Sequence, residues 1–204
     1  MYIPKLFAET DEEALLAFMR EFNFATLVTA ENDFPTATHL PFIIEKRGDK
    51  IVLSAHLAKA NLHWKQFEKD ILVIFQEPHA YISPSHYTEK LNVPTWNYVA
   101  VHAYGKAKIF ESVEENLALL EKMIVEFDKN YFENQWREIP DEYKISNAKG
   151  IIAFEIEVTN LQGKKKLNQN KGLQDAENVI AAFDKSGNQN ERQIARFMKE
   201  VYQK

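Results

Sequence analysis

Apolar and polar residues follow a helical rhythm in several parts of the chain. Residues 10–22 and 112–130 carry apolar side chains three and four positions apart, which is the spacing of an amphipathic helix. Both ranges open with a capping box, in which a Ser or Thr is followed three residues later by Glu: Thr10 with Glu13, and Ser112 with Glu115. Near the C-terminus, helical spacing recurs at 174–185 and 190–202. The sequence therefore predicts helices at both ends of the chain and one in between.

Between these helices, β-branched and aromatic residues form short runs of the kind found in strands. The runs are 24–30, 34–45, 50–56, 70–78, 79–84, 95–111 and 150–161, with turns predicted at Glu31-Asn32-Asp33 and Arg47-Gly48-Asp49. Links of hairpin length favour antiparallel pairing. Closing such strands into a small barrel removes exposed strand edges. We therefore predict a mainly β protein with peripheral helices (α+β), built on a small antiparallel β-barrel.

Composition and charge narrow the class of protein. The chain has 204 residues, 45% of them hydrophobic, which suits one compact domain, 1–170, with a small helical extension, 171–204. The formal net charge of −5 is a poor match to DNA, so direct DNA binding is doubtful. No run approaches the roughly 18 apolar residues of a membrane span, and no signal-peptide pattern follows Met1. We expect a cytoplasmic protein that makes no membrane contact.

Metal and nucleophile chemistry find no support in the sequence. The absence of cysteine excludes disulfides, thiolate metal sites and cysteine nucleophiles. The six histidines include no HExxH pair, so no metal site is predicted. No G-x-S-x-G elbow is present, which argues against a hydrolase triad built on His102. No residue is predicted to be a general acid or base.

The stretch HLAKANLHW, residues 56–64, lies where a strand-like run ends and a short helix is predicted to begin near Leu57. A helix start presents unpaired N–H groups and a positive dipole end. Lys59 would add a cation in the first turn, where this dipole disfavours it. An anion such as a phosphate at the junction would explain that cation. The alternative is an ordinary helix start, with Lys59 in solvent and Trp64 in the core.

Two later segments also combine ring systems or cations with amides. In VPTWNY, residues 93–98, Trp96 and Asn97 would suit a flat heterocycle, whereas the alternative is a half-buried strand with its aromatic side chains in the core. GKKKLNQNK, residues 163–171, is the basic cluster of the sequence, with too few lysines for a DNA surface. Its interleaved amides suit a polar ligand or a subunit contact, and equally a loop that caps itself.

Taken in order along the chain, several of these motifs resemble the PaiB family of FMN-binding negative transcriptional regulators, within the pyridoxamine-phosphate-oxidase-like split barrels. The resemblance covers almost the whole length. The segments that carry it are MYIPKLFAE, ATLVTAENDFPTATHLPF, HLAKANLHW, VIFQEPHAYISPSHY, VPTWNYVAVHAYG and GIIAFEIEVTNLQGKKKLNQNK.

The resemblance implies a six-stranded antiparallel split β-barrel, a homodimer, and FMN held in clefts at the dimer interface. In such barrels the segment matching SAHLAKAN grips the flavin phosphate, and the segment matching Ala37–Leu40 lies along the isoalloxazine edge. The residues implied to bind the cofactor are Thr38, His39, Leu40, His56, Lys59, Asn61, Trp96, Asn97, Lys166, Asn168, Gln169 and Asn170.

This sequence departs from the family pattern at three places. Lys59 stands where relatives usually carry Arg, so that a point charge replaces a planar, bidentate fork. Leu62-His63 replaces a usual Pro-Gln, and LNQNK replaces a usual LSQNR. These changes keep the charge and alter the geometry, which bears on how tightly FMN is retained.

The resemblance leaves more than one function open. The first hypothesis is a flavin-binding regulator or sensor, although no helix-turn-helix signature is present. The second is a flavin-dependent oxidoreductase acting on a small molecule, for which His39 and His102 are the side chains of interest. The third is a haem-handling relative, known among split barrels.

Overall fold

The computed structural model describes residues 1–31 and 34–202. Its strands are β1 (Ala8–Glu9), β2 (Phe24–Glu31), β3 (Phe34–Pro41), β4 (Ile43–Arg47), β5 (Lys50–Ala58), β6 (Ile71–Ile82), β7 (Thr95–Ile109) and β8 (Ile151–Lys166). Its helices are α1 (Glu12–Glu21), α2 (Val113–Phe127), α3 (Lys129–Asn134), α4 (Asp141–Lys149), α5 (Leu173–Asp184) and α6 (Gln189–Tyr202). Four short 3-10 helices are η1 (Lys5–Phe7), η2 (Leu62–Gln66), η3 (Pro84–His86) and η4 (Trp136–Glu138).

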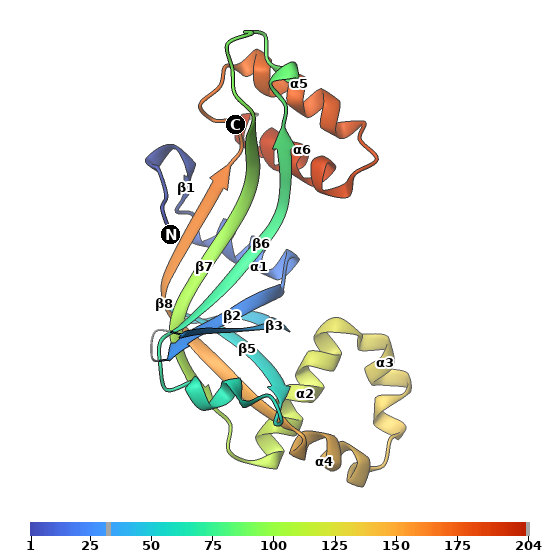
Figure 1. Ribbon diagram of the computed structural model, residues 1–204. Coiled ribbons are helices and arrows are strands. Elements are labelled where there is room, and N and C mark those ends of the chain that lie inside the picture. The colour runs from blue at the N-terminus through green and yellow to red at the C-terminus, as the bar shows by residue number, and fades with distance from the viewer. Residues whose placement is uncertain (32–33, 203–204) are drawn as a thin grey trace. The chain divides into compact units, whose positions relative to one another are not determined.

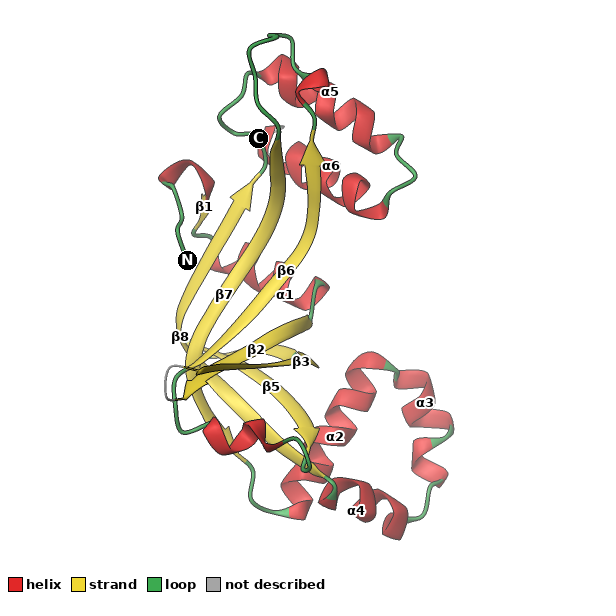
Figure 2. Cartoon of the chain, in the orientation of Figure 1, coloured by secondary structure: helices red, strands yellow, loops and turns green. Residues whose placement is uncertain are grey.

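The strands belong to one sheet in the order β3-β2-β6-β7-β8-β5-β4, with β1 paired to β8 (Figure 2). The pairs β1–β8, β2–β3, β2–β6, β4–β5 and β5–β8 are all antiparallel. This confirms the mainly β class with peripheral helices. The sheet has eight strands where the resemblance implied six. The two-residue β1 adds a strand and the predicted run 34–45 is divided at Phe42 into β3 and β4, whereas the predicted runs 70–78 and 79–84 form the single strand β6.

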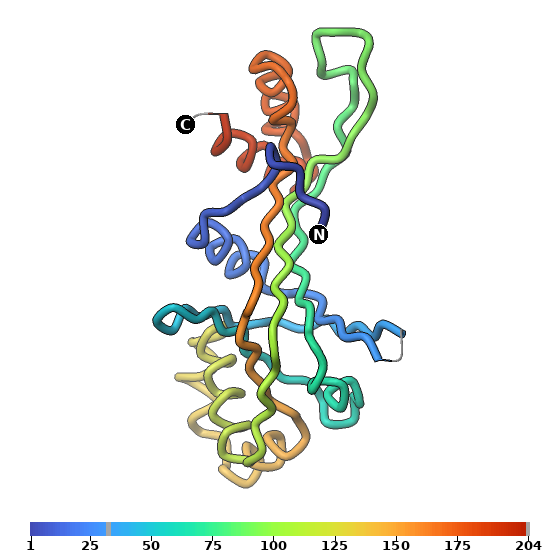
Figure 3. Tube along the Cα trace, turned by 90° about the vertical axis from the view of Figure 1, so that its left-hand side faces the viewer, coloured from blue at the N-terminus to red at the C-terminus, as the bar shows by residue number. Residues whose placement is uncertain are grey.

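Chain contacts group the residues into two compact units, which are described separately. The first unit comprises 1–15, 75–102 and 162–204, and the second comprises 16–74 and 103–161. β6, β7 and β8 each contribute residues to both units (Figures 1 and 3). The division predicted at residue 170 stays a prediction.

In the second unit, α2 packs on the outer side of β4, β5 and β8. Ile43, Leu119, Met123 and Ala153 form a buried cluster there. The helix begins at the predicted capping box, because the Ser112 hydroxyl accepts from the Glu115 N–H and the Glu115 carboxylate accepts from the Ser112 N–H. The sequence prediction missed α3 and α4, which are short helices that follow α2 directly (Figure 1).

The buried amide of Asn116 ties α2 to the start of β8. Its Nδ2 lies 3.3 Å from both the Ala148 and Ile151 carbonyl oxygens, and its Oδ1 accepts from the Ala153 N–H at 3.2 Å. One side chain therefore satisfies three backbone groups where the chain leaves α4 and enters the sheet.

In the first unit, α5 and α6 confirm the two predicted C-terminal helices, and they lie side by side (Figure 3). Buried side chains of these two helices include Val179, Phe183, Ile194 and Met198. At the other end of the chain, Asp11 caps the start of α1 in place of the predicted Thr10, because its carboxylate accepts from the N–H groups of Glu13 and Ala14.

One predicted turn, Glu31-Asn32-Asp33, falls in part on residues 32 and 33, which lie outside the described residues. The predicted turn at Arg47-Gly48-Asp49 is present between β4 and β5. Gly48 has a φ of 62°, a left-handed backbone conformation that is strained for residues with a side chain. Within the described part of the chain, no helix is long and apolar enough to cross a membrane.

Candidate functional site

The segment HLAKANLHW does not form the predicted helix start. β5 continues to Ala58, because His56, Leu57 and Ala58 pair with Ala153, Ile152 and Ile151 of β8, and the Lys59 N–H then donates to the Gly150 carbonyl at 2.9 Å. The helix that follows is the five-residue η2, capped by Asn61. The prediction of a helix beginning near Leu57 is therefore wrong, and Lys59 lies in the turn before η2.

Hydrogen bonds tie this turn, residues 59–61, to β3. Asn61 Nδ2 donates to the Thr38 hydroxyl at 3.3 Å, and Asn61 Oδ1 accepts from the His63 N–H at 3.1 Å. The indole N–H of Trp64 donates to the Lys59 carbonyl at 3.2 Å. The structure thus brings the predicted residues Thr38 and Asn61 together and fixes the backbone beside Lys59.

Lys59 is exposed, and no carboxylate among the described residues lies within ion-pair distance of its ammonium group. Other basic side chains of the second unit have carboxylate partners, such as Lys50 with Glu157 at 2.8 Å and Lys122 with Glu45 at 2.6 Å. The charge of Lys59 is therefore available to an anionic ligand beside the hydroxyl of Thr38 and the amide of Asn61.

β3 stands at one end of the sheet order, so its outer edge presents backbone donors and acceptors. Of the predicted residues on this strand, His39 is exposed and its Nδ1 lies 3.0 Å from the Thr26 hydroxyl, whereas Leu40 is buried. The alternation of a strand separates the two side chains. His39 can therefore meet a ligand through its side chain, and Leu40 only through its backbone.

The structure places His56 against α2. Its Nδ1 lies 3.1 Å from Met123 Sδ, and burial lowers the pKa of the ring. The ring lines an apolar pocket of about 270 Å³ together with Pro41, Leu120, Met123, Ile124, Phe127, Asp128 and Tyr131. Its role beside a flavin phosphate stays a prediction.

In the first unit, Trp96 and Asn97 lie on opposite faces of β7. Trp96 is 52% exposed, and its ring centroid lies 5.9 Å from those of both His79 and Tyr81. Asn97 is buried, with Nδ2 3.6 Å from Met198 Sδ, and its Oδ1 has no hydrogen-bond partner among the described residues. Trp96 thus belongs to an exposed aromatic group, and Asn97 to the contact between β7 and α6.

The segment after β8 makes mostly local hydrogen bonds. Gln169 accepts from the Leu167 N–H at 2.7 Å and donates to the Lys165 carbonyl at 2.6 Å. Asn168 is buried with a φ of 67°; its carboxamide oxygen lies 3.5 Å from the Tyr87 hydroxyl, and its Nδ2 has no partner among the described residues. Asn170 is exposed. These bonds are those of a loop that caps itself, one of the two alternatives for this stretch.

The three consecutive lysines at the end of β8 each have an intramolecular partner. Lys164 donates to the Tyr2 carbonyl at 3.1 Å, Lys165 pairs with Glu9 at 3.0 Å, and Lys166 donates to the Thr95 hydroxyl. Thr95 directly precedes Trp96 in β7, so this hydrogen bond holds the predicted site residue Lys166 beside the start of β7. Each of these three lysine side chains is therefore held by a contact within the chain.

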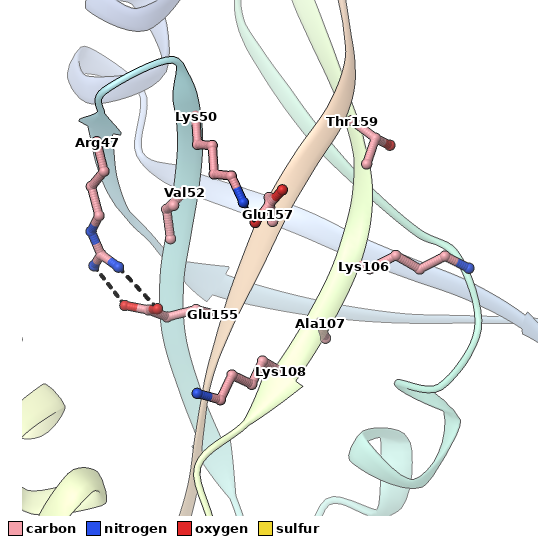
Figure 4. A pocket seen from close by; sticks show the side chains of 9 residues that line it. All are labelled: Arg47, Lys50, Val52, Lys106, Ala107, Lys108, Glu155, Glu157 and Thr159. Carbon is pink, nitrogen blue, oxygen red and sulfur yellow. Dashed lines mark hydrogen bonds and ion pairs between the residues drawn. The ribbon is translucent and has the colours of Figure 1, made fainter.

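A separate cavity of about 510 Å³ lies in the second unit over β5, β7 and β8 (Figure 4). Four basic side chains line it, but Arg47 binds Glu155 through two hydrogen bonds, Lys50 pairs with Glu157, and Lys106 pairs with Asp70. Arg47 holds the pKa of Glu155 below its ordinary value through these bonds. Because most of its cations are balanced by carboxylates, and none of the predicted site residues lines it, this cavity is not the candidate cofactor site.

Sequence reasoning missed several residues that support the turn at Lys59. His63 is 4% exposed and lies between two hydroxyls, 2.8 Å from Thr38 Oγ1 and 2.8 Å from Thr29 Oγ1. Thr29 also donates to the Gln66 carboxamide oxygen at 2.5 Å, and Gln66 donates to the Thr36 hydroxyl at 3.3 Å. No local signal pointed to these contacts, because Thr29, Thr36 and Thr38 lie in the runs 24–30 and 34–45, which the run 50–56 separates from His63 in the sequence.

Comparisons with known proteins identify the family and the fold of the chain. A family model described as "Putative FMN-binding domain" matches residues 1–160. The protease synthase and sporulation protein PAI 2 of Bacillus subtilis (strain 168) is 41% identical, over 100% of this chain and 99% of its own length. An uncharacterized protein of Emericella nidulans is 30% identical over 98% of this chain and 97% of its own.

Among solved structures, the flavocytochrome Anf3 of Azotobacter vinelandii superposes with a TM-score of 0.61 at 15% identity, covering 80% of this chain and 72% of its own. The FAD and heme binding protein of Mycobacterium smegmatis also gives 0.61, at 13% identity, covering 86% of this chain and 79% of its own. These likenesses show the fold, which is the split barrel of the pyridoxamine-phosphate-oxidase type. The chain therefore belongs to the FMN-binding split-barrel family of PaiB, represented by PAI 2.

Proposed function

We propose that this protein binds one FMN per subunit at a homodimer interface and acts as a flavin-binding regulator or sensor. The observation that supports the site is the exposed cation of Lys59, which has no carboxylate partner among the described residues, on a turn held to β3 by the Asn61–Thr38 hydrogen bond. A phosphate would balance the positive charge of Lys59 and accept hydrogen bonds from neighbouring donors.

The residues present also fit the flavin ring. The outer edge of β3 offers backbone donors and acceptors for the polar edge of a heterocycle. When bound, FMN would supply redox chemistry, and the chain's own groups would supply binding and orientation.

The homodimer is proposed because a flavin cleft in this fold is closed by two subunits. The large aromatic side chains left exposed on β6 and β7, Tyr81 at 48% and Trp96 at 52%, are the kind that an interface covers. Direct binding to DNA is not part of the proposal. The lysines at the end of β8 already have partners within the chain, and the net charge is −5.

The alternative is an FMN-dependent oxidoreductase acting on a small molecule. Exposed His39 on the edge strand is the observation that favours it, since the ring would stand beside the flavin edge. Titration of FMN into the protein at micromolar concentration tests the binding itself, with quenching of flavin fluorescence expected. Steady oxidation of NAD(P)H by the loaded protein, with a small-molecule acceptor present, would favour the enzyme over the sensor.

A further inference from the structure

The hydrogen bonds around His63 form a chain whose direction follows from the His63 backbone N–H on one side and from the placement of the Gln66 carboxamide on the other. The backbone N–H of His63 can only donate, so the Asn61 atom that it contacts is the carboxamide oxygen. Asn61 therefore presents its NH₂ group to the Thr38 hydroxyl. Because Thr38 accepts from Asn61, its own hydrogen is free to donate to His63 Nδ1, 2.8 Å away.

The other side of the ring gives the same direction. The Thr29 hydroxyl has one hydrogen, which it donates to the Gln66 carboxamide oxygen. Thr29 must then accept from His63 Nε2–H, 2.8 Å away. The Gln66 NH₂ group in turn donates to Thr36. His63 is thus the neutral tautomer with its hydrogen on Nε2, and every polar atom of the ring is satisfied.

The surroundings of the ring hold it in that state. Besides the two threonines, the ring meets Phe67, whose centroid lies 5.7 Å away, and burial lowers the pKa of His63. With both ring nitrogens bound to hydroxyls, His63 is neither a metal ligand nor a base for a substrate. Within the described residues, no group of side chains that could hold a metal ion is present.

The geometry points to His63 as a positioning residue for the phosphate end of the proposed flavin site. It fixes the Thr38 hydroxyl, which fixes the Asn61 amide, and so sets the turn that carries Lys59. This inference rests on the proposed function. It adds that recognition of the flavin phosphate, rather than of the isoalloxazine ring, depends on the buried side chain of His63, which need not touch the cofactor.

The chain of hydrogen bonds around His63 also predicts which substitutions at this position preserve the site. Gln at position 63 offers one acceptor and one donor group, which match the acceptor Nδ1 and the donor Nε2–H of the neutral ring. Ala offers neither and leaves the Thr38 hydroxyl hydrogen without its acceptor. His63→Gln should therefore rescue what His63→Ala loses, whereas a role in packing alone would favour a residue closer to the ring in shape.

FMN and riboflavin titrations of His63→Ala, His63→Gln and the wild type test the inference. For His63→Ala we expect FMN to bind about tenfold more weakly, the scale of one buried hydrogen bond, while riboflavin affinity changes by less than about threefold. His63→Gln should regain most of the FMN affinity. Equal losses for the two flavins, or no loss for either, would overturn the positioning role.

Two further measurements keep the test decisive if His63→Ala folds poorly. Thr38→Val should weaken FMN to a similar extent, and its combination with His63→Ala should add little, because both break the same chain. Histidine nitrogen spectra of the wild type should show His63 with a bare Nδ1 and a protonated Nε2 at pH 7; the opposite tautomer would overturn the inference. Failure of the wild type to bind FMN would count against the proposed function, whereas the tautomer would still report on the chain.

Discussion

The Asn61 side-chain amide donates to the Thr38 hydroxyl across 3.3 Å, and this contact joins the turn after β5 to the edge strand β3. The two residues are distant in sequence and belong to different strand-turn segments. Their contact brings a hydroxyl and an amide together in the second unit, two residues along the chain from Lys59. The predictions below begin from this arrangement.

Lys59→Ala should weaken FMN binding by roughly 1.5–3 kcal/mol, the scale of a charge-assisted hydrogen bond. Lys59→Arg should bind FMN at least as well as the wild type, because a planar fork matches a phosphate. Riboflavin affinity should respond little to either change. Lys69→Ala, which removes another exposed lysine after η2, is the matched control. Fluorescence titrations give the dissociation constants, and equal FMN affinity in the wild type and Lys59→Ala would remove Lys59 from the site.

The protein should have a mass in solution of twice 23.7 kDa when FMN is present. An interface that covers Tyr81 and Trp96 removes apolar surface from water, and isologous pairing of identical chains is the commonest way to achieve this. Light scattering coupled to gel filtration measures the mass. A monomeric mass at micromolar concentration with bound FMN would contradict the dimer.

DNA binding should be weak and independent of sequence. The net charge of −5 opposes binding to a phosphate backbone, and Lys165 in the basic cluster is already paired with Glu9. Mobility shifts with specific and scrambled duplexes at increasing salt provide the measurement. Sequence-selective binding that persists at about 150 mM salt would be the contrary result.

Asn116→Ala should lower the free energy of unfolding by about 2–4 kcal/mol, because it leaves buried backbone groups of Ala148, Ile151 and Ala153 without partners. Asn147→Ala provides the control, since its amide donates to the Tyr143 carbonyl on an exposed face of α4 and its loss should cost less than about 0.5 kcal/mol. Urea unfolding followed by circular dichroism compares the two. Similar losses for both variants would contradict the role given to Asn116.

Acid should remove the stability contributed by Glu155. Its pKa is lowered from an ordinary value of 4.5, chiefly by hydrogen bonds from Arg47, so the folded state favours the ionised carboxylate. That contribution is present above pH 4.5 and is lost as the pH falls through the lower pKa of the folded state. Glu155→Gln should cost up to about 1 kcal/mol at pH 7, because Arg47 is partly exposed, and progressively less as the pH falls below 4.5. Unfolding curves at a series of pH values from 7 downward measure this; Glu157→Gln, in a more exposed ion pair, should cost less.

Local signals predicted the elements that local interactions determine. The capping box at Ser112 marks the start of α2, and the spacing of apolar residues marks α5 and α6. The end of β5 was misplaced because Leu57 and Ala58 are held in the strand by pairing with β8, almost a hundred residues away in the chain. α3 and α4 were missed because they are short, and contacts such as that of Asn116 with Ala148 stabilise them from outside.

For the candidate site, the sequence suggested which kinds of residue to consider but not how they are arranged. The helix-start argument predicted an anion beside Lys59, and the family resemblance added Asn61; that reason for Lys59 is wrong, since no helix begins there, and the contact of both residues with a phosphate stays a prediction. Trp96 and Asn97 are adjacent in sequence, yet the alternation of β7 gives them opposite surroundings. His63 was noted as a departure from the family pattern but was given no role in the site, because its contacts depend on two hydroxyls that the pairing of β2 with β3 brings together.

The way β6, β7 and β8 cross between the units limits how this protein can change by recombination. Each unit is assembled from non-contiguous parts of the gene, so a single crossover between residues 16 and 161 would exchange fragments of both units at once. Transferring either unit intact between relatives would require several exchanges in register. We therefore expect variation to accumulate through point substitutions and loop insertions, and we expect chimaeras with one junction inside a long strand to fold poorly.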